Sequence, residues 1–329
     1  MADLKKLRLL VTPTSFGQSV PEIWDELEDI FGEVIRNETG RPLLGSELAT
    51  MIKDVDAVIA GLDEVNALVF EKANRLKVVS RYGVGIEKVD LSAATAHKVV
   101  VTNTPGANAV SVAELAIGLM LACMRNICEL NDLTRKGDWP RSEGVSLRGK
   151  IIGLIGLGAI GMGVADRLGA FGCKIVSYDP YTKPETASSH SVKLLPLDEL
   201  LSLSDVISLH APVTPQTKEM VNQEFLGKVK PGVVLINTAR GQLVDEMALV
   251  NALKDGRVRA AGLDAFINEP PGKDNPLFQF PQVIATPHTG AHCDDAVTAM
   301  SIKAKENCIA VLKGERPTNV VNPDVYENK

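Results

Sequence analysis

The sequence predicts an α/β protein built from two Rossmann-like, doubly wound parallel-sheet domains. Three observations predict this class: strand and helix patterns alternate along the chain, a glycine-rich strand-to-helix turn lies near its middle, and 329 residues are enough for two domains. Alternation is typical of parallel sheets, because a crossover between parallel strands usually carries a helix. We therefore expect one parallel sheet in each domain.

The first hundred residues contain apolar runs that indicate buried strands. Between them lie segments whose apolar residues recur at helical spacing. This order predicts a flavodoxin-like sheet with helices on its faces. The predicted strands are residues 7–11, 57–60, 78–81 and 99–103, and the predicted helices are residues 20–31, 45–53 and 90–97.

A long helical pattern at residues 110–134 precedes the second set of elements. It contains the longest near-apolar run, residues 115–124, which is too short to span a bilayer and is expected to form a buried interface helix. Beyond it we expect a doubly wound sheet of about six strands. These strands are predicted at residues 151–155, 174–178, 206–210, 233–237, 260–264 and 283–286, with a helix at 246–254.

The chain is predicted to return to its first domain at the end. Residues 296–312 form a helical pattern that is too short for a third domain, so we expect it to pack on the N-terminal domain. The Asn-Thr-Pro-Gly segment that starts at Asn103 marks the other boundary. The predicted first domain is therefore discontinuous, residues 1–103 with 293–329, and the second comprises residues 104–292.

The glycine-rich turn carries the fingerprint of a dinucleotide-binding site. A buried strand runs directly into Gly156-x-Gly158-x-x-Gly161, and a helical pattern follows. Gly156 permits a tight turn, Gly158 lets the backbone approach a pyrophosphate, and Gly161 lets helix and strand pack closely. The helix N-terminus offers N–H groups and a partial positive charge to the phosphates.

The strand after this turn ends on Asp179, at about the 20-residue distance that the fingerprint requires. A carboxylate there accepts hydrogen bonds from ribose hydroxyls and repels a 2′-phosphate. The expected cofactor is therefore NAD rather than NADP. The structural alternative for Asp179 is a solvated strand end before Pro180. The second domain is thus predicted to bind NAD, and the first to bind substrate.

Composition argues against several classes of protein. The net charge of −6, from 35 basic and 41 acidic residues, argues against a nucleic-acid binder. The N-terminus shows no signal-peptide pattern, and no apolar run is long enough for a membrane span. The five scattered cysteines have no metal-ligand spacing, so we expect a cytoplasmic protein with reduced thiols, no metal site and a passive thiol at Cys293.

Three polar side chains, Arg240, Glu269 and His288, lie at or beyond the ends of the later strands, where ligands bind in open α/β sheets. Histidine suits proton transfer near neutral pH, and arginine holds a carboxylate in bidentate fashion. A carboxylate orients the imidazole and favours its charged form. Taken singly, these residues could be a surface charge, a solvated loop acid and a structural histidine. Together they predict hydride transfer on a hydroxy acid.

Over essentially its whole length, the chain resembles the D-isomer-specific 2-hydroxyacid dehydrogenases. The resemblance implies the roles given above for Arg240, Glu269 and His288. It rests on short motifs distributed over both predicted domains. The matching segments are Arg81-Tyr82-Gly83-Val84-Gly85, Asn103-Thr104-Pro105, Ser111-Val112-Ala113-Glu114-Leu115, the turn from Gly156 to Gly161, His210-Ala211-Pro212, Asn237-Thr238-Ala239-Arg240-Gly241, Gly262-Leu263-Asp264 and Pro287-His288.

The same resemblance implies a wider set of site residues. It places Thr238 and Asp264 beside the nicotinamide, and it suggests that the backbone amides of Val84 and Gly85 hold the substrate carboxylate. The cofactor-binding set is Gly156, Gly158, Ala159, Ile160, Gly161, Asp179, His210, Ala211, Pro212, Thr238, Ala239, Arg240, Asp264, His288 and Gly290, and the substrate-binding set is Arg81, Tyr82, Gly83, Val84, Gly85, Arg240 and His288.

The expected partners are a small 2-hydroxy or 2-keto acid and a second copy of the chain, with residues 112–124 contributing to a homodimer. Within the family, the chain resembles the phosphoglycerate dehydrogenase branch in a short form, which implies 3-phosphoglycerate and 3-phosphohydroxypyruvate as the substrate pair. Asp63 and Glu64 stand where such relatives tend to carry a basic residue and would oppose a phosphate. Reduction of glyoxylate or hydroxypyruvate is therefore an alternative, and a non-catalytic NAD-sensing, partner-binding protein is another.

Overall fold

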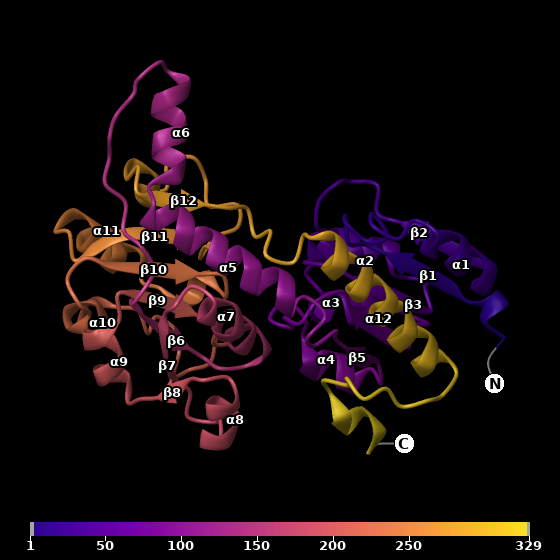
Figure 1. Ribbon diagram of the computed structural model, residues 1–329. Coiled ribbons are helices and arrows are strands. Elements are labelled where there is room, and N and C mark those ends of the chain that lie inside the picture. Colours follow the sequence, from indigo (N-terminus) through magenta and orange to yellow (C-terminus); the bar gives the residue numbers. More distant parts are fainter. Residues whose placement is uncertain (1–2, 328–329) are drawn as a thin grey trace. The chain divides into compact units, whose positions relative to one another are not determined.

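The computed structural model describes residues 3–327, which divide into two compact units. The first unit runs to Asn108 and resumes at Ala291, and the second comprises Ala109–Gly290 (Figure 1). Each unit contains one parallel sheet, so the predicted fold class is confirmed. The chain crosses between the units after residues 108 and 290, where the sequence predicted crossings after 103 and 292.

The sheet of the first unit has the strand order β2-β1-β3-β4-β5, which is the flavodoxin-like order. All four pairings are parallel. The sequence did not predict β2, because this strand lies at the sheet edge with a charged residue at each end and no buried residue. The strands are β1 (Arg8–Val11), β2 (Glu33–Arg36), β3 (Ala57–Ala60), β4 (Val78–Arg81) and β5 (Val100–Thr102).

Helices cover both faces of this sheet. Alternate strand residues point to opposite faces, so Leu9 and Leu10 of β1 lie in different cores. Leu9 packs in the core that includes the first helix of the unit and the C-terminal helix, and Leu10 packs in the core beneath the remaining three helices. The C-terminal helix contacts β3, β4 and β5, and the Ser80 hydroxyl donates a hydrogen bond of 2.8 Å to the Ala304 carbonyl. The helices are α1 (Ile23–Ile30), α2 (Gly45–Met51), α3 (Ala67–Lys72), α4 (Leu91–Ala96) and α12 (Asp294–Leu312), with short 3₁₀ turns η1 (Leu4–Lys6) and η4 (Pro323–Tyr326).

The sheet of the second unit has the order β12-β11-β10-β9-β6-β7-β8, all parallel. Counted from β8, this is the Rossmann order 3-2-1-4-5-6 with a seventh strand added. The sequence predicted about six strands and missed β8, which has two residues. The strands are β6 (Ile151–Ile155), β7 (Lys174–Tyr178), β8 (Lys193–Leu194), β9 (Val206–Leu209), β10 (Val233–Asn237), β11 (Val258–Leu263) and β12 (Val283–Ala285).

Two hydrophobic cores lie on the two faces of this second sheet. Helix α5 packs against α7, β10 and β11, and nine of its sixteen residues are buried. The opposite core contains side chains from α9, α10 and α11. The helices are α5 (Ala109–Met124), α7 (Ala159–Gly169), α8 (Pro184–Ser189), α9 (Leu197–Leu203), α10 (Gln223–Lys228) and α11 (Glu246–Lys254), with 3₁₀ turns η2 (Gly241–Leu243) and η3 (Pro276–Gln279).

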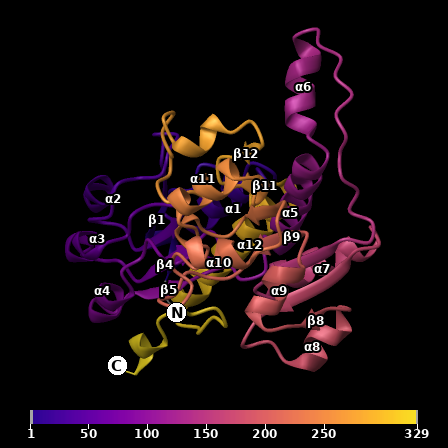
Figure 2. The ribbon, with the colours of Figure 1, turned by 90° about the vertical axis from the view of Figure 1, so that its left-hand side faces the viewer.

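The prediction of one continuous helix over residues 110–134 is wrong. Helix α5 ends at Met124, and a separate helix, α6 (Ile127–Arg135), starts after Asn126, whose φ is 52°. The two helices are bent by 61°. Helix α6 and the chain that follows it project from the second unit (Figures 1 and 2). No residue between 125 and 146 is buried in this projection, which we call the α6 arm.

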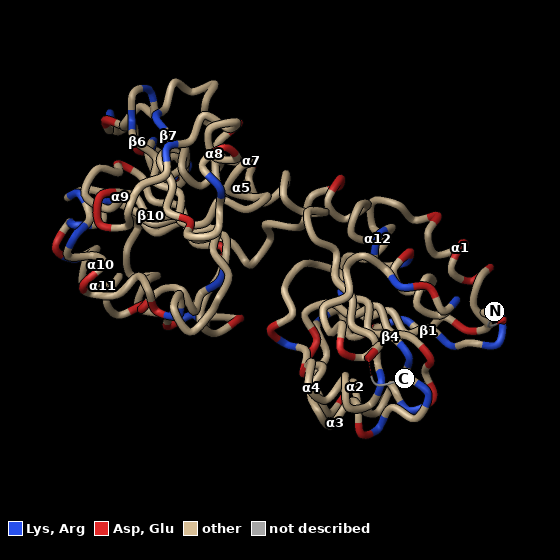
Figure 3. Tube along the Cα trace, turned by 90° about the horizontal axis from the view of Figure 1, so that it is seen from below, with Lys and Arg blue, Asp and Glu red and all other residues tan. Residues whose placement is uncertain are grey.

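No single helix in residues 3–327 is long and apolar enough to cross a membrane. By length and composition alone, the bent pair of α5 and α6 could span a membrane. However, nine of the sixteen residues of α5 are buried within the second unit. Basic and acidic residues are interspersed along the trace of each unit rather than separated by sign (Figure 3).

Candidate active site

The predicted glycine fingerprint forms the turn between β6 and α7. Gly156 has a φ of 95°, which glycine adopts readily, and a Cβ there would lie 2.7 Å from the His210 carbonyl. A Cβ on Gly161 would collide with the Gly156 carbonyl oxygen, whereas one on Gly158 would meet no atom within 4 Å. Helix α7 has no side-chain cap at its N-terminus. The turn therefore leaves open backbone in front of a helix N-terminus, as a pyrophosphate site requires.

Asp179, at the end of β7, fastens this turn. One carboxylate oxygen accepts a hydrogen bond of 2.8 Å from the Leu157 amide, and the other accepts bonds of 2.8 and 3.1 Å from the amides of Tyr181 and Thr182. Burial raises the pKa of Asp179, but these backbone bonds outweigh it and lower the pKa below the ordinary value. A negative charge is therefore fixed beside the glycine turn.

Two orphaned polar groups lie beyond the neighbouring strands β9 and β10. Thr238 Oγ1 and His210 Nδ1 are buried, and neither makes a hydrogen bond with a residue that the structure describes. His210 Nε2 lies 2.9 Å from Ser208 Oγ, and burial lowers the pKa of His210 to about 4, so its ring is neutral. Buried polar groups normally have partners. These two, with the open glycine turn and the charge of Asp179, fit a bound dinucleotide such as NAD.

The imidazole of His288 and the carboxylate of Glu269 lie in contact after strands β12 and β11. His288 Nδ1 lies 2.9 Å from Glu269 Oε2 and 3.0 Å from Oε1. Burial raises the pKa of Glu269, but the bond to His288, the Phe266 amide and the charge of Arg240 together lower it below its ordinary value. Glu269 is therefore a carboxylate that orients the imidazole.

Arg240 follows β10 in a turn that Asn237 holds at both ends. The side-chain NH₂ group of Asn237 donates a hydrogen bond of 2.8 Å to the Arg240 carbonyl. Its side-chain oxygen accepts a hydrogen bond of 3.0 Å from the Ala239 amide. The sequence did not predict this role for Asn237, although an asparagine at a strand end is a recognised signal for such a turn. The guanidinium Nη1 donates 2.8 Å to the Ala239 carbonyl. The turn thus fixes the position of the Arg240 guanidinium, whose positive charge helps to lower the pKa of Glu269.

Asp264 holds the loop that carries His288. It is 2 % exposed, and its carboxylate accepts hydrogen bonds of 2.6 Å from Thr286 Oγ1, 2.8 Å from the Thr289 amide and 2.8 Å from the Gly290 amide. These bonds enclose His288, whose φ of 53° is unusual for a residue with a side chain. The resemblance implied cofactor contact for Asp264 and Gly290, and the structure gives both a further part in fixing this loop.

The predicted substrate residues 81–85 belong to the first unit. Arg81 is 3 % exposed and donates to the carbonyls of Ala60 at 2.8 Å and Gly85 at 3.1 Å. The Tyr82 hydroxyl lies 3.3 Å from Ser15 Oγ, and Gly83 has a φ of 133°. The amides of residues 84 and 85 make no hydrogen bond with a described residue. Arg81 therefore shapes a loop whose next amides are available to an anion.

Asp63 does not present its charge as the sequence suggested. It is fully buried and accepts hydrogen bonds from the Gly61 amide at 2.8 Å, from the Leu43 amide at 2.7 Å and from the Thr12 hydroxyl. Glu64 accepts 3.1 Å from the Gly45 amide. Both acids satisfy backbone donors in their own unit. The two acids therefore have structural partners in this unit, and the expectation that they oppose a nearby phosphate stays a prediction.

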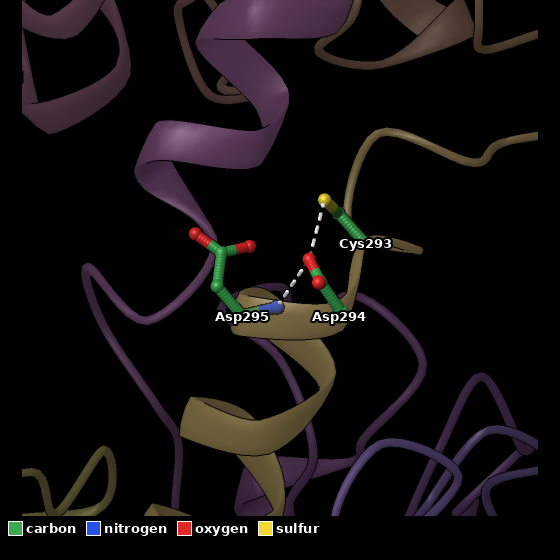
Figure 4. Close-up of side chains that lie close together, drawn as sticks. All are labelled: Cys293, Asp294 and Asp295. Carbon is green, nitrogen blue, oxygen red and sulfur yellow. Dashed lines mark hydrogen bonds between the residues drawn. The ribbon is translucent and has the colours of Figure 1, made fainter.

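Cys293, Asp294 and Asp295 lie together at the start of α12 (Figure 4). Cys293 Sγ donates to Asp294 Oδ1 at 3.3 Å, and this bond, with burial and the nearby acids, raises the pKa of the thiol. The acids stand in the first turn of α12, where negative charge stabilises a helix. The cluster is thus explained by the helix terminus and a protonated thiol.

Comparison with known proteins places the chain in a family. Residues 117–290 match the model of the D-isomer specific 2-hydroxyacid dehydrogenase, NAD binding domain. A glyoxylate reductase from Thermofilum pendens is 39% identical over 92% of this chain and 91% of its own length. The solved structure of a Thermus thermophilus protein is 37% identical, with a TM-score of 0.85 over 96% of this chain and 100% of that one.

The chain belongs to the D-isomer-specific 2-hydroxyacid dehydrogenase family, and its cofactor is NAD. A D-3-phosphoglycerate dehydrogenase from Methanocaldococcus jannaschii is 44% identical over 305 residues, which are 91% of this chain and 58% of that protein. The chain thus spans little more than half the length of this relative.

Proposed function

We propose that this protein is an NAD-dependent dehydrogenase that moves a hydride between the nicotinamide and C2 of a D-2-hydroxy acid. The observation that carries the proposal is the contact of His288 Nδ1 with both oxygens of Glu269, 2.9 and 3.0 Å away. The positive charge of Arg240 also acts on this pair, because it helps to lower the pKa of Glu269. A base, its orienting carboxylate and a fixed cation are the groups that oxidation of a hydroxy acid needs besides the cofactor.

When bound, NAD would supply or accept the hydride. His288 takes the C2 hydroxyl proton on Nε2 during oxidation and returns it to the forming alkoxide during reduction. Glu269 holds Nδ1 and supports the charged imidazole. Arg240 holds the carboxylate and polarises the C2 oxygen. The amides of Val84 and Gly85 are the proposed second ligands of the carboxylate, since no described residue occupies them.

For the substrate we propose 3-phosphoglycerate and 3-phosphohydroxypyruvate. This proposal is supported by the 44% identity to the Methanocaldococcus jannaschii relative. The alternative is reduction of glyoxylate or hydroxypyruvate. It is favoured by the Thermofilum pendens relative, which matches over nine-tenths of both chains, and by the bonds that Arg81 makes to main-chain oxygens.

A scan of NADH consumption at 340 nm with four 2-keto acids tests both proposals. We expect the highest kcat/KM with 3-phosphohydroxypyruvate, followed by hydroxypyruvate, glyoxylate and pyruvate. A higher kcat/KM with glyoxylate would overturn the proposed phosphoglycerate substrate and favour reduction of glyoxylate or hydroxypyruvate. Tight NADH binding with no consumption for any of the four acids would instead favour a non-catalytic NAD-sensing protein.

We also propose that the protein works as a cytoplasmic homodimer in which the α6 arm contacts a second copy. Support comes from apolar side chains on an arm with no buried residue: Trp139 is 77% exposed and Ile127 is 51% exposed. Contact with a second copy would remove both apolar side chains from water, which is favourable. The five free thiols are consistent with a reducing compartment. Sedimentation should give a dimer for the parent chain and a monomer for the Ile127→Asp, Trp139→Asp variant; a monomeric parent would contradict the proposal.

A further inference from the structure

Glu246, the first residue of α11, bonds to both ends of the exposed segment that carries Glu269. Its Oε1 accepts a hydrogen bond of 3.2 Å from the Ile267 amide. Its Oε2 accepts one of 3.1 Å from the side-chain amide of Asn275. One carboxylate therefore spans the segment and ties it to a helix of the same unit.

The segment has little other support between its two buried anchors. Phe266 on one side and Leu277 on the other are in the hydrophobic core, while residues 267–270 and 272–274 are exposed. Within the segment, the Phe266 amide donates 3.2 Å to Glu269 Oε1, the same oxygen that lies 3.0 Å from His288 Nδ1. The position of the Glu269 carboxylate therefore depends on the backbone that Glu246 holds.

The same helix is joined to the turn of Arg240. The 3₁₀ turn η2 and two further residues separate Arg240 from Glu246, and Gly241 packs so closely on the Phe266 carbonyl that a Cβ would collide with it. The start of α11 is thus the point where the chain segments of Arg240 and Glu269 meet. Glu246 stands there with a polar bond to each end of the Glu269 segment.

We propose that Glu246 is a positioning residue that acts through Glu269 to hold the imidazole of His288 in its working orientation. Its carboxylate bonds to Ile267 and Asn275 rather than to the three proposed catalytic groups. This proposal rests on the proposed dehydrogenase function. Because catalysis is sensitive to displacements of about 1 Å, loss of the Glu246 bonds should lower kcat about 10- to 100-fold and leave NADH affinity unchanged.

A polarity swap tests the contact itself. In Glu246→Gln the new amide group faces the Asn275 amide, donor against donor, and in Asn275→Asp two carboxylates face each other. Asp and Asn both keep the oxygen that accepts 2.9 Å from the Leu277 amide. Each single variant should lose kcat, and the double variant Glu246→Gln, Asn275→Asp should recover most of it, since an amide then donates to a carboxylate. A general loss of stability would not be rescued in this way, so failure of the rescue would overturn the proposal.

A double-mutant cycle tests the route through Glu269. Glu246→Ala should lower kcat in the parent and have little further effect on Glu269→Gln, because both remove the same support. Equal losses in both backgrounds would contradict the proposal. The control is Asp245→Ala. The Asp245 carboxylate caps α11 by accepting hydrogen bonds of 3.0 and 3.1 Å from the amides of Met247 and Ala248. Its loss weakens α11 but removes no hydrogen bond to the segment that carries Glu269. It should leave kcat unchanged; a loss equal to that of Glu246→Ala would overturn the proposal.

Hydrogen exchange separates this proposal from the proposed function. The amides of residues 266–275 should exchange faster in Glu246→Ala than in Asp245→Ala, whatever the protein's substrate. An inactive parent with this difference would overturn the dehydrogenase assignment alone, and an active parent without it would overturn the positioning role of Glu246.

Discussion

His288 meets Glu269 through Nδ1, which lies 2.9 Å from one carboxylate oxygen and 3.0 Å from the other. An ionised carboxylate has no proton to donate, so it acts only as an acceptor. The hydrogen bond between the two residues therefore uses a proton on Nδ1 of His288. Nε2 makes no bond to any residue in the described part of the chain. The pair therefore assigns one ring nitrogen to orientation and leaves the other for proton exchange.

Replacement of His288 by alanine should remove the general acid–base group. We expect kcat to fall by about 10²- to 10⁴-fold, the usual contribution of such a group. NADH affinity, measured by fluorescence titration, should stay close to that of the parent, because the glycine turn and Asp179 are untouched. Near-parental turnover in His288→Ala would show that another residue transfers the proton.

Glu269 should make the stability of the protein depend on pH. Its pKa in the folded chain lies below the ordinary value of 4.5, so the ionised carboxylate stabilises the fold above that pH, and this contribution is lost as the pH falls through the folded pKa. The Tm of Glu269→Gln should lie below that of the parent at pH 7, and the gap should close on acidification below pH 4.5. Glu38→Gln, at an exposed residue, serves as the control. A gap that is constant with pH would argue against stabilisation by the ionised Glu269 carboxylate.

Gly158 and Gly161 should respond differently to alanine. A Cβ on Gly161 collides with the Gly156 carbonyl, so Gly161→Ala should lower the Tm and NADH affinity together. Gly158 has a φ of −78° and open space around it, so Gly158→Ala should keep nearly the parental Tm. It should lose NADH affinity, because the methyl group would enter the space proposed for the pyrophosphate. Thermal melts and fluorescence titrations distinguish the two. Unchanged NADH affinity in Gly158→Ala would show that the cofactor phosphates do not bind at Gly158.

The negative charge of Asp179 should exclude NADPH. Asp179→Asn keeps an oxygen for the Leu157 amide and removes the charge, so the preference for NADH over NADPH should fall about tenfold, the size expected from repulsion between exposed charges a few ångströms apart. The ratio of the two dissociation constants measures this. Asp179→Ala is the matched control, in which the turn also loses its fastening and affinity for both cofactors should drop. A constant ratio in Asp179→Asn would mean that selectivity does not depend on this carboxylate.

The sequence predicted the fold where local pattern and tertiary role agree. Buried strands such as β3 and β10 are short apolar runs, and both have their predicted bounds. The break after α5 could not be predicted, because Ile127, Leu130 and Leu133 continue the helical period past it. The break depends on the left-handed backbone of Asn126, a conformation that asparagine tolerates but does not require.

The same distinction holds for the site. Arg240, Glu269 and His288 were predicted because each follows a recognisable strand. The roles of Asp63 and Asp264 were not, because both carboxylates are satisfied by donors from distant segments: Asp63 by Leu43, and Asp264 by Thr289 and Gly290. No short-range pattern reports which backbone amides will surround a buried acid.

The left-handed backbone of His288, with its φ of 53°, has a consequence for how the reaction starts. Asp264 fixes the loop on both sides of the ring, so the protein's own hydrogen bonds hold this strained conformation. The site is in this respect preorganised: the imidazole does not have to search for its orientation at each turnover, and encounter with substrate needs little rearrangement of this loop.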